Sequence, residues 1–353
     1  MARGGYKIFD ADTHVRPDAD LLEPYLSASA RAKLAHYENF KTRNKEGAIT
    51  YLMGERKYKR RLGLAGDEEP QSKEYMSGYK RHQHGKPNPL CERDPAIRIN
   101  DMDLEGVDVN LILPSGWFGC WTTIEDVAFE TSVYEAYHRW MADYCGAFAH
   151  RLKGVILIGC RDLEASLKEL ERCAKAGIKG SIIWQAPHPN LPFHSEHYNK
   201  FWAASQDLQI PVHLHILTGH GYHKESVFGN KRTGVEAYRG SVNLKLKEII
   251  DAYFELIFYG VFERYPALKV GAVEFEIAWA PYFMNRMDNV YSERAQGVIH
   301  HRFKDSALPS DFFRQNVFIS FQEDALGIQL RSYVGVDNLM WGSDYPHAES
   351  TFP

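Results

Sequence analysis

The sequence predicts a (β/α)8 barrel with a long insertion after its first strand. Eight short apolar runs recur along the chain, and stretches with helical periodicity lie between them, which is typical of a parallel sheet with crossover helices. Carboxylate or imidazole side chains follow four of these runs, where a barrel carries its reactive groups. An open doubly wound sheet is the alternative, and it is disfavoured because no Gly-x-Gly-x-x-Gly follows the first run.

The predicted strands cover residues 6–12, 107–114, 154–159, 178–184, 210–216, 268–274, 316–321 and 338–344. The clearest helical stretches lie around residues 96–104, 125–148 and 163–175. Only nine residues follow residue 344, which is too few for a closing helix. We therefore expect residues 1–353 to form one barrel domain of a chain that continues further.

Two segments do not fit the strand–helix rhythm. Residues 29–93 separate the first two strands, and residues 41–86 carry twelve basic against six acidic side chains, a local charge of +6. This charge predicts either a solvated insertion or a lid that attracts an anionic substrate. Residues 218–240 are rich in glycine and histidine and follow the fifth strand, so we predict an active-site loop there.

The composition excludes several classes of protein. The chain is 44% hydrophobic and 25% charged, with a net charge of −4, which excludes a disordered, collagenous or coiled-coil protein. We expect no nucleic acid and no membrane as a partner, because the chain is mildly acidic and its apolar runs are much shorter than the ~20 residues of a membrane span. Five cysteines without a Cys-x-x-Cys pair predict reduced thiols in a cytoplasmic protein.

The polar residues at the strand ends predict a metal site. The first strand ends in Asp10, Asp12 and His14, which period-2 alternation places on one face. The fifth strand ends in His213 and His215, the sixth in Glu274 and Glu276, and the eighth in Asp344 and His347. Such groups repel one another around a barrel axis unless a divalent cation joins them. His215 lies nearer the strand exit and is the better ligand, whereas His213 is expected to lie behind it as a hydrogen-bonded neighbour.

These residues resemble a known family. The segments Phe-Asp-Ala-Asp-Thr-His at 9–14, Pro-Val-His-Leu-His at 211–215 and Trp-Gly-Ser-Asp-Tyr-Pro-His at 341–347 resemble the amidohydrolase-2 family of metal-dependent hydrolases and decarboxylases. So do residues 101–108 and 264–269. The resemblance implies a barrel with one catalytic metal, often zinc and sometimes manganese or iron, held by Asp12, His14, His215 and Asp344.

One departure from the family pattern affects the expected reaction. Decarboxylating relatives carry an essential histidine after the sixth strand, where this chain has Glu274. We therefore predict a metal-dependent hydrolase that acts on a small anionic or aromatic carbonyl compound through a metal-activated water, with Glu274 as the general base and His347 as a second catalytic candidate. Decarboxylation stays open as an alternative.

Two further alternatives rest on the ligand set. One alternative adds Glu274 and Glu276 to the four ligands above, which gives four carboxylates and two imidazoles. Ligand sets of this kind hold two irons in di-iron proteins, so the protein could be an iron monooxygenase. If the sixth strand ends at Glu274, however, Glu276 lies at a helix N-terminus without a catalytic role. The other alternative is a degenerate barrel that only binds its ligand. We also expect a homodimer.

The remaining candidates are substrate-binding residues with a structural explanation beside each. His220 and His223 could contact substrate or lie exposed in their loop, and Glu323 could contact substrate or cap the next helix. Arg16 could orient a carboxylate or phenolate of the substrate. Trp117, Phe118, Trp121 and Trp184 could line an aromatic pocket or pack the barrel rim.

Overall fold

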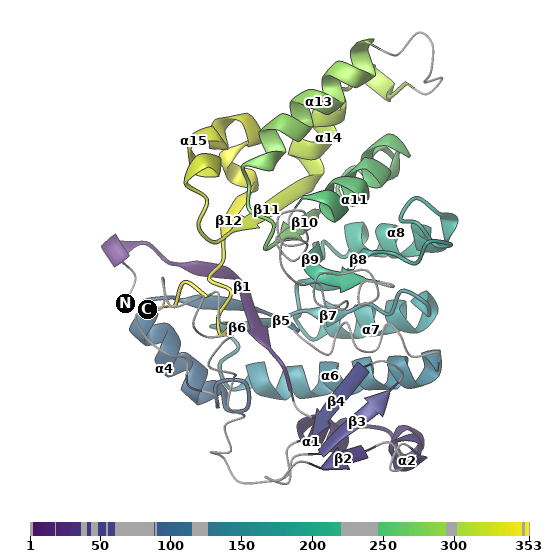
Figure 1. The fold of residues 1–353 in the computed structure, drawn as a ribbon, viewed down its shortest axis with the longest axis vertical. Coiled ribbons are helices and arrows are strands. Elements are labelled where there is room, and N and C mark those ends of the chain that lie inside the picture. The colour runs from purple at the N-terminus through teal and green to yellow at the C-terminus, as the bar shows by residue number, and fades with distance from the viewer. Residues whose placement is uncertain are drawn as a thin grey trace, which may run out of the picture. The chain divides into compact units, whose positions relative to one another are not determined.

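The computed structural model divides the chain into two units, one made of Met1–Ile178 with Gly342–Pro353 and the other of Lys179–Trp341 (Figure 1). The structure describes residues 3–17, 19–36, 41–43, 49–53, 56–60, 88, 90–114, 126–219, 246–293, 302–347 and 350–352. Each unit contains parallel strands that alternate with helices, as the sequence predicts.

The first unit is built on three parallel strands in the order β1-β5-β6. They are β1 (Phe9–Val15), β5 (Val109–Pro114) and β6 (Leu152–Gly154), and β7 (Ile156–Leu157) follows directly. The helical elements of this unit are η1 (Arg3–Gly5), α1 (Ala19–Leu22), η2 (Glu23–Tyr25), α2 (Ala28–His36), α4 (Pro95–Glu105), α6 (Val127–Gly146) and α7 (Leu163–Lys175). Asp94, Asp126 and Asp162 start the last three, each accepting a backbone N–H of the first turn.

The second unit contains five parallel strands in the order β12-β11-β10-β9-β8. They are β8 (Ser181–Ala186), β9 (Val212–Gly219), β10 (Val270–Val273), β11 (Val317–Phe321) and β12 (Leu339–Trp341). Its helical elements are η4 (Glu196–Tyr198), α8 (Asn199–Asp207), α11 (Lys247–Phe258), α12 (Val261–Arg264), α13 (Trp279–Glu293), η5 (Lys304–Ser306), α14 (Pro309–Asn316), α15 (Ala325–Val334) and η6 (Val336–Asn338). All eight predicted strands are therefore present, the third of them as the pair β6 and β7.

The predicted insertion contains structure that the sequence did not indicate. Besides α2 it holds an antiparallel sheet of β2 (Lys41–Arg43), β3 (Ile49–Met53) and β4 (Arg56–Arg60), in the order β2-β3-β4. Most of the other residues between 37 and 89, and the predicted loop from residue 220 onwards, lie outside the described residues. The roles of lid and active-site loop therefore stay predictions.

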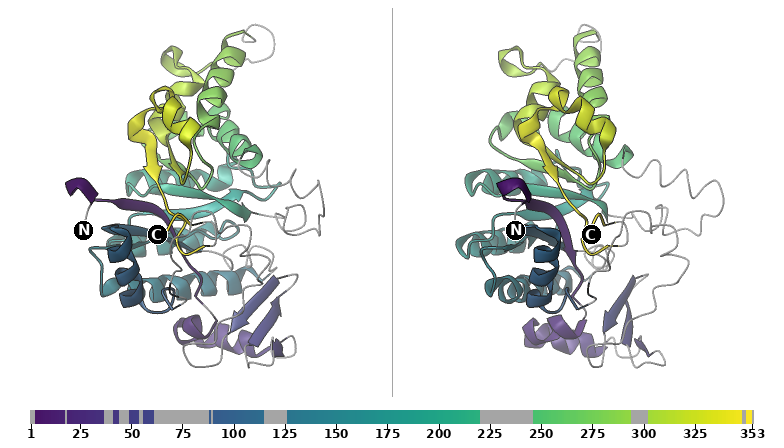
Figure 2. Two further views of the ribbon diagram at one scale, coloured as in Figure 1. Left: turned by 60° about the vertical axis from the view of Figure 1, so that its left-hand side comes forward. Right: turned by 90° about the vertical axis from the view of Figure 1, so that its left-hand side faces the viewer.

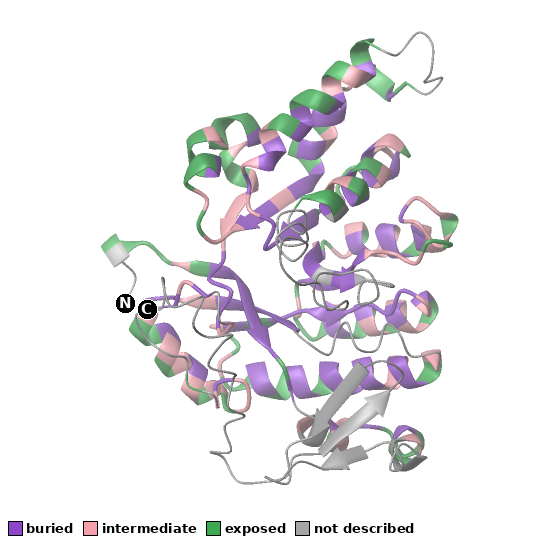
Figure 3. Ribbon diagram, viewed as in Figure 1, coloured by how far each residue is buried: buried purple, intermediate pink, exposed green. Residues whose placement is uncertain are grey.

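Burial distinguishes the strands from the helices that flank them. β1, β5, β8, β10 and β11 are buried along most of their length, β12 is half-buried, and the flanking helices present an exposed face (Figure 3), as expected for parallel sheets with helices packed on them. In β1 the buried positions include Asp10, Asp12 and His14 as well as Ala11 and Val15. Buried carboxylates are rare unless they are paired or bind a cation, so β1 stands out within the core.

The C-terminal segment after β12 packs on β1. It runs beside that strand (Figure 2), and the Asp344 amide donates a hydrogen bond of 2.8 Å to the Asp12 carbonyl. Gly342 permits this approach, because a Cβ at this position would lie 2.4 Å from Asp12 Cβ and 3.0 Å from Asp12 N.

We therefore expect Gly342→Ala to lower the free energy of unfolding by about 1–3 kcal/mol, because the added methyl group overpacks the junction. Urea denaturation followed by circular dichroism measures the loss. Gly146→Ala is the matched control: a Cβ there meets nothing within 4 Å, and alanine is the better helix former. Equal denaturation midpoints for Gly342→Ala and the unchanged protein would contradict this packing argument.

The described helices include none with the length and apolar character needed to cross a bilayer. Four cysteines lie in the described part of the chain, at positions 91, 145, 160 and 173, and all four are buried and form no disulfide.

Candidate metal centre

A buried cluster of imidazoles and carboxylates lies where β1 meets the segment after β12. His14 Nε2 is 3.0 Å from Asp12 Oδ1 and 3.1 Å from Asp344 Oδ1. His347 Nδ1 is 2.7 Å from the same Asp344 oxygen, and its ring stacks on His14 with 4.2 Å between the ring centroids. Asp12, His14 and Asp344 are buried, whereas the His347 side chain is 39% exposed. His347 is therefore the member of this cluster that solvent or a substrate can reach.

Backbone pairing brings these side chains together. The His14 amide donates to the Tyr345 carbonyl at 2.6 Å, and Thr13 and Tyr345 form an isolated parallel bridge. Asp344 adopts a φ of 59°, in the left-handed region that aspartate tolerates better than most residues. Such a conformation costs about 1–3 kcal/mol and persists only where the surroundings hold it.

Asp10 stabilises the cluster without joining it. The pairing of β1 with β5 gains one residue between Asp10 and Thr13, so the predicted alternation of Asp10 with Asp12 and His14 is interrupted by a bulge. The Asp10 carboxylate instead accepts hydrogen bonds from the Ser343 amide at 2.9 Å and the Ser343 hydroxyl at 2.5 Å. Burial raises the pKa of Asp10 to about 8, although these hydrogen bonds oppose the rise.

The electrostatics of the cluster favour a cation. Burial lowers the pKa of His14, but hydrogen bonds to Asp12 and Asp344 outweigh this and raise it to about 10. Burial acts to raise the pKa of Asp344, and the neighbouring His347 and His14 hold it below its ordinary value. Two buried carboxylates thus concentrate negative charge on one imidazole, and a divalent cation can take the place of its proton.

A second pair of predicted ligands lies in the other unit. His215, at the end of β9, has its Nε2 3.5 Å from Glu274 Oε2, and both side chains are about one-tenth exposed. His215 Nδ1 donates to the Ile216 carbonyl at 2.8 Å, so Nε2 is the ring nitrogen on the side of Glu274. A histidine held through its other nitrogen in this way is typical of metal ligands.

The donor spacings within each unit fit a metal ion. Two donors that each lie ~2.1 Å from one ion are about 3.0 Å apart at a right angle and about 3.4 Å apart at the tetrahedral angle. The distances from His14 to Asp12 and to Asp344 match the first value, and the distance from His215 to Glu274 matches the second.

Glu274 and Glu276 lie beyond the sixth strand, because β10 ends at Val273. Both have left-handed backbones, with φ of 66° and 58°, so strand alternation does not place them on one face. The Glu274 amide donates to Ser320 Oγ at 3.0 Å. Glu276 lies in the turn before α13, and its Oε2 accepts a hydrogen bond of 3.3 Å from the Gln322 amide. The structure thus pairs Glu274 with His215 and directs Glu276 to the backbone after β11.

The other predicted site residues fall in different surroundings. His213 is buried, and its Nδ1 donates to the Ser181 carbonyl at 2.8 Å; its role beside the metal ligands stays a prediction. Trp184 is completely buried in β8, whereas Arg16 and Glu323 are exposed. Trp117, Phe118, Trp121, His220 and His223 lie outside the described residues.

A third histidine cluster has a structural explanation. His138 Nε2 accepts from the Leu157 amide at 2.9 Å, and Nδ1 lies 2.8 Å from Glu169 Oε2. Burial lowers the pKa of His138 although Glu169 opposes this. The neutral ring therefore uses both nitrogens in bridging α6, β7 and α7, which leaves no lone pair for a metal.

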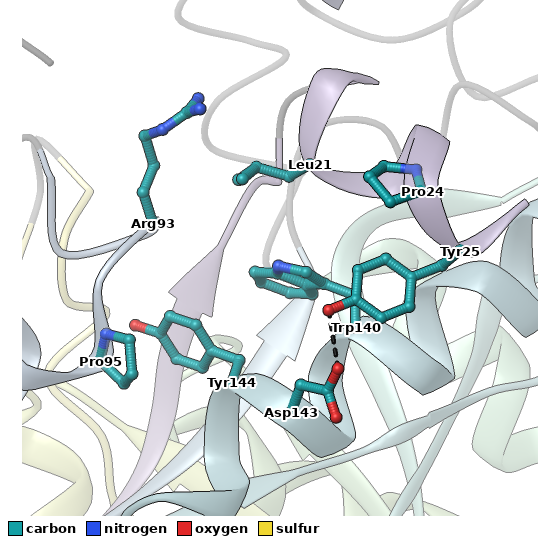
Figure 4. Close-up of a pocket in the computed structure, with 8 residues that line it drawn as sticks. All are labelled: Leu21, Pro24, Tyr25, Arg93, Pro95, Trp140, Asp143 and Tyr144. Carbon is teal, nitrogen blue, oxygen red and sulfur yellow. Dashed lines mark hydrogen bonds between the residues drawn. The ribbon is translucent and has the colours of Figure 1, made fainter. Parts of the chain in front are cut away.

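The first unit also has a surface pocket of about 380 Å³ between α1, α4 and α6. Tyr25, Trp140 and Tyr144 contribute its aromatic walls and Arg93 a cationic side chain (Figure 4). Tyr25 Oη donates to Asp143 Oδ2 at 2.7 Å. None of the residues that line this pocket belongs to the predicted site.

Comparison with known proteins identifies the family. The sequence pattern of the family described as Amidohydrolase matches residues 10–353. The chain therefore belongs to the amidohydrolase family. This confirms the resemblance found in the sequence.

Individual amidohydrolase relatives are distant in sequence but similar in fold. A gamma-resorcylate decarboxylase from Polaromonas sp. is 23% identical over 273 residues, which is 70% of this chain and 76% of that protein. An amidohydrolase from Mycobacterium avium subsp. paratuberculosis has a TM-score of 0.72 at 20% identity, over 99% of this chain and 92% of that one. A 5-carboxyvanillate decarboxylase from Novosphingobium aromaticivorans, complexed with manganese and 4-hydroxy-3-methoxy-5-nitrobenzoic acid, has a TM-score of 0.64 at 16% identity, over 98% and 88%. These similarities confirm the predicted (β/α)8 fold class.

Proposed function

We propose that this amidohydrolase is a metal-dependent decarboxylase of small aromatic acids. The observation that carries the proposal is the buried His14 imidazole between the Asp12 and Asp344 carboxylates. The substrate class is suggested by the decarboxylases of gamma-resorcylate and 5-carboxyvanillate among the similar proteins. The sequence leaves decarboxylation open beside hydrolysis, and these relatives favour decarboxylation.

Asp12, His14 and Asp344 would hold the metal, and we propose His215 as a further ligand. In a (β/α)8 barrel the ends of the first, fifth and eighth strands open on the same rim, which supports adding a residue of β9 to the set. The two carboxylates suit manganese, which a similar decarboxylase binds, whereas the sequence-based preference for zinc stays a prediction. A bound divalent ion would supply Lewis-acid polarisation of substrate oxygens.

Glu274 is our candidate for the proton donor. Decarboxylation of an aromatic acid requires a proton at the ring carbon that bears the carboxylate, after which the C–C bond breaks and carbon dioxide leaves. Glu274 is buried and its backbone amide donates to Ser320 Oγ, which supports a role in which its carboxyl group would deliver that proton and regain one from solvent. It would then take the place of the histidine that decarboxylating relatives carry after the sixth strand. His347, which is partly exposed, would orient the substrate beside Asp344.

Hydrolysis is the second candidate function, and the position of the Glu274 carboxyl group beside His215 favours it. An ionised carboxylate beside His215 is suited to accept a proton from water. The two reactions therefore differ in the protonation state in which Glu274 begins the reaction, and product analysis separates them.

The proposal predicts that chelation inactivates the protein and that Mn²⁺ restores it. We expect metal-free protein to release no carbon dioxide from 2,6-dihydroxybenzoate or 5-carboxyvanillate, and reloading to restore release. Mn²⁺ at about 100 times its dissociation constant should raise the free energy of unfolding by about 2.7 kcal/mol, measured by thermal denaturation. Full activity after exhaustive chelation would refute the proposal.

Metal content tests the iron alternative. Protein prepared without oxygen should contain one divalent ion per chain, measured by plasma mass spectrometry. Two irons per chain, together with oxygen uptake in the presence of substrate, would replace decarboxylation by the monooxygenase hypothesis.

A further inference from the structure

Arg98 is a completely buried arginine in the first turn of α4. Within the described part of the chain no carboxylate lies within ion-pair distance of its guanidinium, and Nη1 has no hydrogen-bond partner there. Burying a guanidinium without a counter-charge costs several kcal/mol. An apolar side chain of similar volume would therefore fill this position at lower cost, so packing alone does not explain Arg98.

The contacts that Arg98 makes converge on the candidate metal centre. Nη2 donates to the carbonyl oxygen of His14, and the guanidinium carbon lies 4.9 Å from the centre of the Tyr345 ring. Nε donates to Tyr144 Oη at 3.1 Å, and that hydroxyl donates in turn to the Cys91 carbonyl. One side chain thus touches both segments that carry the predicted ligands, at the point where they pair.

The same face of α4 makes a second contact with the ligand-bearing segment. Asp101, one turn after Arg98, accepts a hydrogen bond from Tyr345 Oη. Tyr345 directly follows Asp344. Helix α4 therefore contacts this segment twice, at the Tyr345 ring through Arg98 and at the Tyr345 hydroxyl through Asp101. Figure 1 shows α4 beside β1 and the C-terminal segment.

We propose that Arg98 is a positioning residue that sets the separation of His14 and Asp344 and thereby the affinity of the site for its metal. The inference rests on the proposed function, since it requires these residues to be ligands. Arg98 acts through the His14 carbonyl and the Tyr345 ring and touches no ligand atom. Residues that orient ligands in this way typically contribute 10–100-fold to metal affinity.

Arg98→Lys tests the proposal, because lysine keeps the positive charge but cannot bond to His14 and Tyr144 through a rigid fork. We expect the dissociation constant for Mn²⁺, measured by calorimetric titration of the metal-free protein, to rise about 10–100-fold. The electron paramagnetic resonance spectrum of bound Mn²⁺ should also change, because the ligands shift. A purely structural role would lower the melting temperature of the metal-free protein but leave the Mn²⁺ affinity unchanged.

Arg151→Lys is the matched control. Arg151 also bonds through its guanidinium to backbone carbonyls, at 3.1 Å to Asp108 and 2.7 Å to Val107, but at the start of β5 rather than at the end of β1. We expect this variant to lose stability and to keep the Mn²⁺ affinity of the unchanged protein.

The outcomes separate this inference from the proposed function. If the unchanged protein takes up no Mn²⁺, the proposed function fails together with this inference. If it binds Mn²⁺ and Arg98→Lys binds equally well, the inference about Arg98 alone is wrong. Should Arg98→Lys not fold, Tyr144→Phe decides, because it removes only the hydroxyl that anchors Nε; affinity about 10-fold lower supports the positioning role, and unchanged affinity refutes it.

Discussion

Replacing Asp344 with asparagine is expected to abolish metal binding and with it all turnover. The amide keeps the shape of the carboxylate but removes its charge, and Asp344 contacts both His14 and His347. Mutating a residue that only orients a ligand typically lowers metal affinity about 10–100-fold. Losing the ligand itself should cost more, so we expect the affinity for Mn²⁺ to fall by more than about 100-fold. Calorimetric titration and carbon dioxide release measure the two losses.

Asp324→Asn is the matched control for Asp344→Asn. Asp324 follows β11 as Asp344 follows β12, but its carboxylate accepts hydrogen bonds from the backbone amides of Ile277, Ala278 and Gly327. It therefore connects two helix starts, and its loss should lower stability without changing metal affinity. Retention of Mn²⁺ by Asp344→Asn would remove Asp344 from the ligand set.

Glu274→Gln is expected to slow turnover about 100- to 10,000-fold, the usual contribution of a positioned proton donor or acceptor. Glutamine keeps the side chain beside His215 but cannot transfer the proton. Because we assign Glu274 to proton transfer, the variant should retain its Mn²⁺. Single-turnover kinetics and metal analysis of the same preparation measure both.

Glu276→Gln provides the comparison, since Glu276 contacts the Gln322 amide and we expect its turnover to change only a few-fold. Loss of metal from Glu274→Gln would make Glu274 a ligand, and full activity would remove it from the mechanism.

Much of the fold and the composition of the site could be predicted from local sequence patterns. Eight apolar runs predicted the eight strands, because burial on both faces requires such runs in a parallel sheet. The carboxylate and imidazole side chains at the strand ends predicted Asp12, His14, His215, Glu274 and Asp344 as candidates. The structure brings Asp12 and Asp344 to His14 within the first unit and Glu274 to His215 within the second. The segments at 9–14 and 341–347 also identified the family.

Other features depended on contacts that no local pattern reports. The sixth strand ends at Val273, so Glu274 and Glu276 leave it in left-handed conformations instead of alternating along it. The bulge in β1 interrupts the alternation that the sequence predicts, so Asp10 does not share a strand face with Asp12 and His14 by simple alternation. A sequence pattern shows which residues a strand would bury, whereas the pairing of neighbouring strands decides where the strand ends or bulges.

The sequence by itself thus determined the barrel, the family and the kinds of side chain at the strand ends. Only the tertiary structure decided which of these side chains meet, and which residues hold them in place. Asp10 bonds to Ser343 across 333 positions of sequence, and Arg98 reaches His14 across 84. The physical reason is that hydrophobic periodicity reflects burial along one element, whereas the hydrogen bonds and charges that organise a site form between elements that are distant in the chain.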